Sequence, residues 1–169
     1  MHEGAQGGDG AAPDDGRTAS TPQDDAASST GRGPASMVVQ RVVEWHDVDG
    51  AGISHNTFAI RLMESAETAL FERLGLTGDL ANPGRRRRIA VDFLQPLSFH
   101  DRVDVLIRTT SVDETQVTFE FEVTRDGAAV MRGTFVAVPG EGLGTEAPSR
   151  AEVVRRLATS GAQAPQLLR

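Results

Sequence analysis

The sequence predicts an α+β fold in which one long helix covers one face of an antiparallel sheet. Residues 56–74 repeat apolar side chains at helical spacing over more than half of the helix circumference. One strand-like run precedes this helix, and four more follow it in a row. A single sheet has an apolar face that must be buried, and one long helix is enough to cover it.

The first two elements are separated by a glycine-rich turn. Residues 37–45 are rich in valine and end in the only tryptophan, a composition typical of a strand. The expected N-cap of the helix over 56–74 is Asn56 or Ser54, because either side chain can accept a hydrogen bond from a free N–H group. Gly75 is the expected end of the helix.

Four strands are expected after the helix, over 86–94, 102–111, 115–125 and 128–138. Residues 117–123 alternate apolar and polar side chains, as a strand with one buried face does. The Arg-Asp-Gly sequence at 125–127 predicts a hairpin turn, and Pro96 separates the second and third strands. The sheet therefore has five strands, and a dimer that extends it would protect its edges.

Both ends of the chain differ in composition from the expected domain at 37–140. Residues 1–36 carry seven glycines and three prolines but almost no large apolar side chain, which predicts an acidic, disordered tail. This tail lacks the pattern of a signal peptide or a transit peptide. Residues 141–169 are expected to form a flexible tail with a short helix around 149–159.

The composition excludes several classes of function. The net charge is −7, and residues 1–36 hold six acidic and two basic side chains, so the rest of the chain carries only −3. A mildly acidic domain argues against nucleic-acid binding, and no apolar run is long enough to span a membrane. The sequence has no cysteine, which fits a cytoplasmic protein, and no lysine, which excludes Schiff-base chemistry.

The sequence DVDGAGISHN at 47–56 holds most of the candidate functional residues. It fails as a calcium loop, because its fifth and twelfth positions are Ala51 and Phe58 rather than oxygen ligands. A zinc site is not expected either. The available ligands are His46, Asp47, Asp49 and His55, and residues 46 and 47 point to opposite faces of a strand. We therefore expect no metal and no other cofactor.

Two interpretations of this segment remain. Asp and Gly are common in turns, so the segment can be an ordinary turn before a helix. Alternatively, a carboxylate lies at the end of a strand, glycines allow close approach, and a helix start follows whose free N–H groups favour negative charge. Such a group of features supports acyl transfer. The carboxylate would attack the acyl group or activate a water molecule, and the free N–H groups would form an oxyanion hole.

Three segments resemble the 4-hydroxybenzoyl-CoA thioesterase branch of the hotdog superfamily. They are VEWHDVDGAGISHN, LMESAET on the helix, and the later VDFLQPLSFHD. The resemblance covers residues 37–138, nearly all of the expected domain. It implies a hotdog fold, a long helix wrapped by an antiparallel sheet, and hydrolysis of an acyl-CoA or acyl-carrier-protein thioester.

The resemblance also implies roles for particular residues. The second aspartate, Asp49, is the catalytic carboxylate, acting as nucleophile or general base. The helix start around His55 and Asn56 polarises the thioester carbonyl, and Gly52 lets the substrate pass close to the backbone. Asp47 is expected to be structural, holding the turn.

A second hotdog branch, the phenylacetate-type thioesterases, gives a competing assignment. In that branch a histidine and paired glycines start the helix, and a carboxylate on the helix is catalytic. His55 stands nine residues before Glu64, which makes Glu64 the competing nucleophile, although Asn56 and Thr57 replace the glycines. Glu67 lies on the apolar side of the helix and needs a partner, which we expect to be an arginine across a dimer.

The arginines at 85–88 form the one basic cluster. It is either a solvated start of a strand or, through Arg86 and Arg88, a contact for the phosphates of coenzyme A. Ile60, Met63, Phe71 and Phe93 suggest an apolar lining of the acyl site, although apolar residues of this kind also form the core. The resemblance implies a homodimer or homotetramer, because hotdog sites form between subunits. The alternatives are a hotdog hydratase or dehydratase, and a protein that binds acyl thioesters without turnover.

Overall fold

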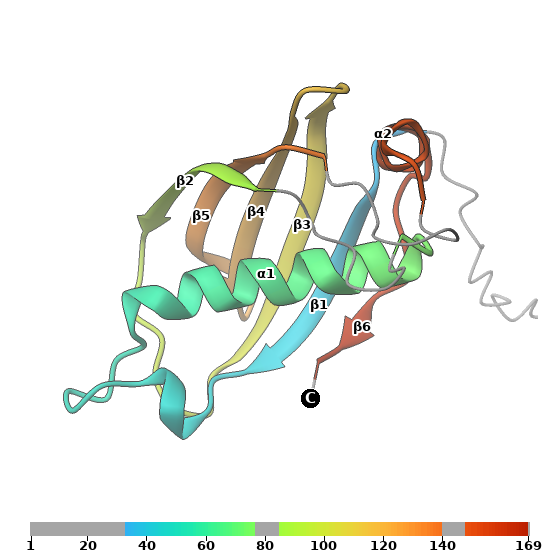
Figure 1. Cartoon of the computed structure of the whole chain (residues 1–169). Helices are drawn as coiled ribbons and strands as arrows, with labels where there is room; N and C mark the ends of the chain where they lie inside the picture. The colour runs from blue at the N-terminus through green and yellow to red at the C-terminus, as the bar shows by residue number, and fades with distance from the viewer. Residues whose placement is uncertain (1–32, 77–84, 140–147, 169) are drawn as a thin grey trace, which may run out of the picture.

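A computed structural model of the chain describes residues 33–76, 85–139 and 148–168, and shows one long helix lying across a curved sheet (Figure 1). The strands are β1 (Ser36–Val42), β2 (Arg86–Phe93), β3 (Arg102–Val112), β4 (Val117–Arg125), β5 (Ala128–Ala137) and β6 (Gln166–Leu167). The helices are the 3-10 turn η1 (Trp45–Asp47), α1 (Asn56–Arg73) and α2 (Arg150–Thr159). The predicted α+β fold is confirmed.

The sheet has six strands in the order β2-β5-β4-β3-β1-β6, not the five expected. The pairs among β1 to β5 are antiparallel, and β6 runs parallel to β1. The extra strand has only two residues, which is too short to produce an alternating pattern in the sequence. The expected first strand was also too long. It ends at Val42, because Glu44 and Asp47 form a capping box that turns the chain into η1.

Helix α1 covers the inner face of the sheet with its apolar side. Its buried side chains include Phe58, Leu62 and Leu70, which pack against inward residues of the strands such as Ile107 and Phe119. The two ends of the helix can be compared with the predicted N-cap and the predicted end at Gly75. The N-cap is His55, whose side chain makes no cap hydrogen bond, so neither Ser54 nor Asn56 has that role. Gly75, at φ +64°, follows the C-cap as predicted.

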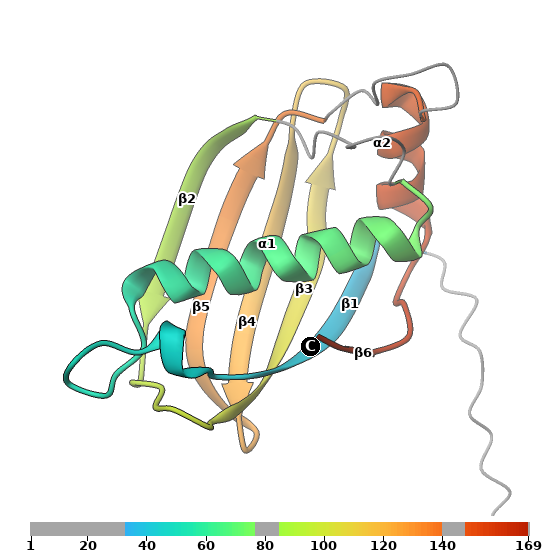
Figure 2. The same cartoon turned by 60° about the horizontal axis from the view of Figure 1, so that its bottom comes forward.

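The segment after residue 148 packs against the domain, unlike the flexible tail that we expected. Helix α2 lies beside the C-terminal end of α1 (Figures 1 and 2), and its Val153 and Leu157 are buried. The N–H of Leu168 donates to the carbonyl of Gln40 in β1 at 2.9 Å. An amphipathic helix of three turns is not stable alone, so this packing is what orders it.

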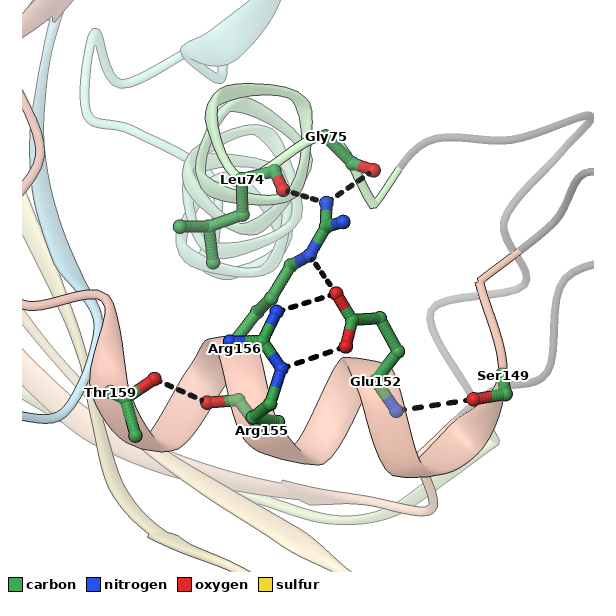
Figure 3. A network of polar contacts seen from close by, with 7 residues as sticks. All are labelled: Leu74, Gly75, Ser149, Glu152, Arg155, Arg156 and Thr159. Carbon is green, nitrogen blue, oxygen red and sulfur yellow. Dashed lines mark hydrogen bonds and ion pairs between the residues drawn. The ribbon is translucent and has the colours of Figure 1, made fainter.

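Arg156 joins α2 to α1 (Figure 3). Its Nη1 donates to the carbonyl oxygens of Leu74 at 2.6 Å and Gly75 at 3.0 Å, and its Nε donates to Glu152 at 2.6 Å. The last carbonyls of a helix have no partner within the helix, and a cation there also suits the helix dipole. Arg156 therefore fixes the C-terminal end of α1.

The N-terminal tail expected over 1–36 lies mostly outside the described residues. Of its last four residues, Ala35 is fully buried, and Ser36 already belongs to β1. None of the described helices has both the length and the hydropathy that crossing a membrane requires.

Candidate functional site

The segment between η1 and α1 forms a tight hairpin beside the end of β2 (Figure 2). The N–H of Asp49 donates to the carbonyl of Ile53 at 2.9 Å, and the N–H of His55 donates to that of Asp47 at 2.8 Å. The N–H of Ser54 donates to the carbonyl of Leu97 at 2.8 Å. The hairpin is therefore anchored to the loop that follows β2.

Asp49 is exposed at the tip of this hairpin, and one of its carboxylate oxygens is held in place. Oδ1 accepts from the N–H of Ala51 at 2.8 Å and from that of Ile53 at 3.4 Å. Among the described residues, Oδ2 has no hydrogen-bond partner. Gly52 is required here for its backbone, since its φ of +77° is costly for other residues, while nothing lies within 4 Å of a Cβ built on it.

Asp47 differs from Asp49 in being fully buried. Its Oδ2 accepts from the N–H of Glu44 at 3.0 Å, and its Oδ1 accepts from Nη2 of Arg61 at 2.6 Å. All of these groups lie in or beside the hairpin, so Asp47 has the structural role that we expected for it.

The start of α1 offers free donors next to the hairpin. His55 and Asn56 are both exposed. Because the His55 side chain does not cap the helix, the N–H groups of Asn56 and Thr57 have no partner among the described residues. Free N–H groups and the positive end of the helix dipole attract developing negative charge.

Glu64 and Glu67 lie further along α1, with different environments. Glu64 is exposed, whereas Glu67 is 1% exposed. Glu67 pairs with Arg86 of β2. Nη1 of Arg86 donates to Oε1 of Glu67 at 2.7 Å, and Nη2 donates to Oε2. The expected arginine partner is thus in the same chain rather than across a dimer.

Burial and mutual pairing act in opposite directions on the pKa values of Glu67 and Arg86. Burial raises the pKa of Glu67 above its usual value, even though the hydrogen bond and charge of Arg86 oppose the shift. Burial works to lower the pKa of Arg86, but the hydrogen bond and charge of Glu67 outweigh it and the pKa is raised. The negative charge of Glu64 also acts to raise both pKa values.

Arg86 and Arg88 do not share a face of the sheet, contrary to the expectation of a joint phosphate contact. The pairing of β2 with β5 shifts register between them, so Arg86 lies opposite Ala137 and Arg88 opposite Val136. Adjacent residues of a strand point to opposite faces. Arg86 therefore faces inward, bound to Glu67, and Arg88 is exposed on the outer face.

Several large apolar side chains are exposed at the same end of the molecule. Ile89 and Phe93 lie on the inner face of β2 and are 38% and 49% exposed. Leu94, Ile53, Phe99 and Trp45, all in the neighbouring loops and η1, are between 42% and 75% exposed. Of the four expected acyl-site residues, Met63 and Phe71 are core residues, Ile60 is half-buried and only Phe93 is exposed. The sequence shows that these side chains are apolar, but it does not show which of them are exposed to solvent in the folded chain.

Two other places in the described residues have the chemistry of a site. Ligand atoms of Glu44, His46 and Asp47 lie within 4.8 Å of one another, but the Arg61 guanidinium is 2.6 Å from Asp47 and opposes a second cation. A hollow of about 360 Å³ lies on the outer face of the sheet, between paired charges such as Arg132 and Glu122. Neither place contains a residue expected to act on a thioester.

A long helix wrapped by a mainly antiparallel sheet is the arrangement of the hotdog fold. The family model of the thioesterase-like superfamily matches residues 43–156. The chain therefore belongs to this superfamily, and its class is that of thioester hydrolases. The match includes most of α2, so the family region extends past the expected end of the domain at residue 140.

Solved structures agree with this assignment. A thioesterase from Thermus thermophilus, complexed with coenzyme A and Zn, is 28% identical, with a TM-score of 0.60 over 71% of this chain and 95% of that one. A predicted thioesterase from Bacillus stearothermophilus is 20% identical, with a TM-score of 0.59 over 72% and 96%. A 1,4-dihydroxy-2-naphthoyl-CoA thioesterase from Synechocystis is 17% identical, with a TM-score of 0.56 over 61% and 80%. No curated protein matches the chain.

Proposed function

We propose that this protein is an acyl-CoA thioesterase in which Asp49 is the catalytic carboxylate. The observation that carries the proposal is the hairpin geometry of Asp49. One oxygen is fixed by backbone N–H groups, and the other is free of partners among the described residues, on a hairpin that leads directly into α1. A fixed carboxylate on the hairpin that precedes a helix start is a suitable arrangement for acyl transfer.

The chemistry follows from these groups. The Asp49 carboxylate either removes a proton from an attacking water or itself attacks the thioester carbon, and the thiolate leaves and takes up a proton. When Asp49 itself attacks, water then hydrolyses the mixed anhydride and restores the carboxylate. The helix start at His55 and Asn56, with its free N–H groups, stabilises the negative charge on the carbonyl oxygen. The products are the free acid and the thiol.

The acyl carrier is coenzyme A in this proposal, rather than a carrier protein. The relative from Thermus thermophilus binds coenzyme A and is the support for this choice. Arg88 is the remaining candidate from the 85–88 cluster for contact with the phosphates, because it is exposed while Arg86 is bound to Glu67.

The active form in this proposal is a homodimer or a dimer of dimers. Exposed apolar side chains on β2 and around the Asp49 hairpin, such as Ile89, Phe93 and Phe99, favour burial against a second copy. Strand β2 is an edge of the sheet as described, which allows it to pair with another β2.

The test is the release of free thiol from a panel of acyl-CoA substrates. Asp49→Asn keeps an oxygen that accepts from the Ala51 N–H but cannot attack or accept a proton, so we expect a loss of about 10²- to 10⁴-fold in kcat. Glu64→Gln is the matched control. Full activity of Asp49→Asn together with loss in Glu64→Gln would transfer the catalytic role to Glu64.

The same panel separates the other functions. A hydratase or dehydratase changes the absorbance of an enoyl thioester without releasing thiol. A binding protein saturates with acyl-CoA and shows no turnover. Either result rejects the proposed activity.

A further inference from the structure

The Glu67–Arg86 ion pair lies at one end of an uncovered apolar surface. On α1, Ile60, Glu64 and Glu67 follow one another at spacings of four and three residues, so they form one stripe. On β2, Phe93 and Ile89 are exposed on the inner face, and Arg86 lies on the same face. We call these three β2 residues the open strip.

Arg86 has more hydrogen-bond donors than its partner uses. A guanidinium has five N–H donors, and two of those of Arg86 bind Glu67. One face of the guanidinium lies 4.6 Å from the centre of the Phe135 ring. Among the described residues nothing accepts from the other N–H groups, and the side chain is 20% exposed. A partly exposed guanidinium thus keeps three N–H groups without an acceptor among the described residues.

An ion pair is not the only means by which β2 could be held against α1. Burying two charges costs free energy, and apolar residues of similar size often stabilise such a place equally well or better. An apolar pair at these two positions would also extend the apolar surface formed by Ile89 and Phe93. The charges of Glu67 and Arg86 therefore suggest recognition of a polar group in an otherwise apolar surface.

We propose that Arg86, oriented by Glu67, recognises a neutral oxygen at the far end of a medium-length acyl chain. This inference rests on the thioesterase function proposed above. With the thioester at the start of α1, the chain runs along the open strip, and Arg86 donates a hydrogen bond to its terminal hydroxyl or carbonyl.

Length and charge restrict the acyl group. Asn56 and Glu67 are eleven residues apart on α1, which is about 16 Å along the axis at 1.5 Å per residue. A single aromatic ring on the thioester is too short to reach Arg86. The charges of Arg86, Glu67 and Glu64 sum to −1, so a terminal carboxylate is repelled where a neutral hydroxyl is not.

The experiment compares kcat/KM for straight-chain acyl-CoAs that end in methyl, hydroxyl or carboxylate at matched chain lengths. We expect the hydroxyl series to exceed the methyl series by about tenfold or more at the preferred length, as a hydrogen bond from a charged donor allows. The carboxylate series should be the poorest. Benzoyl-CoA and its hydroxylated form should not differ.

A double variant tests the residue assignment. Glu67→Leu with Arg86→Met removes both charges and keeps side-chain volume, so the ratio of kcat/KM between the hydroxyl and methyl series should fall to about one. The matched control is Glu122→Leu with Arg132→Met, an exposed ion pair on the outer face that should leave the preference intact.

The outcomes separate this inference from the proposed function. Hydrolysis of all series with no hydroxyl preference, or a preference that survives in the folded double variant, overturns the role of Arg86 and leaves the thioesterase function standing. Failure to hydrolyse any series overturns both. If the double variant does not fold, the substrate comparison with wild-type protein decides alone, because a methyl preference contradicts the proposal and a hydroxyl preference supports it.

Discussion

The two ends of α1 differ in how completely they are covered. At the C-terminal end, α2 packs through buried Leu157, and Arg156 binds the carbonyls of Leu74 and Gly75. At the N-terminal end, His55 leaves the helix uncapped, and the neighbouring Phe93 is 49% exposed. The difference teaches that hydrogen bonds and packing stabilise one end, while the other keeps free donors and exposed apolar surface, which is where we propose that the substrate and a second copy bind.

The two edges of the sheet repeat this contrast. β6 covers part of β1, with the Leu168 N–H bound to Gln40. As described, β2 pairs only with β5 and has no strand on its outer side. An unpaired edge beside exposed apolar side chains can pair with another strand, so β2 is the edge at which we expect a dimer to extend the sheet.

The largest expected effect comes from a charge at the open end. Phe93→Arg places a cation in the apolar surface that a second copy would bury, and we expect the dimer to weaken by roughly 100-fold or more and activity to fall with it. Sedimentation velocity over a concentration series measures this. Thr134→Arg, at an exposed outer-face position, is the control. Dissociation by Thr134→Arg alone would move the interface to the outer face.

At the covered end, removing packing should destabilise the fold without a direct effect on chemistry. Leu157 is 1% exposed, so Leu157→Ala should lower the free energy of unfolding by about 2–4 kcal/mol. Urea unfolding measures the loss, with the half-buried Val154→Ala as control, for which about 1 kcal/mol or less is expected. Equal effects of the two variants would mean that α2 is not packed as described.

A smaller effect is expected from the hydrogen bonds of Arg156. Arg156→Met keeps the aliphatic stem but leaves the carbonyls of Leu74 and Gly75 without this donor, at a cost of about 1–2 kcal/mol in a partly exposed place. Arg155→Met removes an arginine from the same Glu152 and should cost less, because Arg155 is more exposed. Thermal unfolding of both variants ranks them, and the reverse order would contradict the role of Arg156.

The smallest effect is a pH dependence at the covered end. Arg155 and Arg156 lower the pKa of Glu152 from 4.5 to about 2. A carboxyl with a lowered folded-state pKa contributes stability above its unfolded pKa and loses it as pH falls. Between pH 4.5 and 2, wild-type protein should therefore lose stability more steeply than Glu152→Gln. Urea midpoints at several pH values measure both slopes, and parallel slopes would exclude a contribution from Glu152.

The sequence by itself determined the elements that depend on local pattern. The apolar repeat predicted α1 to within one residue at its C-terminal end, and the Arg-Asp-Gly sequence placed the β4–β5 turn. The Asp-Gly-rich hairpin at 47–56 was also recognisable, because its aspartates and glycines satisfy backbone needs within a few residues. The structure gives the positions of the candidate site residues on this hairpin, while their chemical roles remain predictions.

Only the tertiary structure decided which distant groups meet. Glu67 and Arg86 are joined across two elements, and a register shift near Arg87 turns Arg86 inward and Arg88 outward. A shift of one residue exchanges the faces of a strand, and no local pattern in four consecutive arginines reveals it. The order of α2 and β6 likewise comes from contacts with α1 and β1 far away in the chain, because such short segments are stable only when packed against other elements.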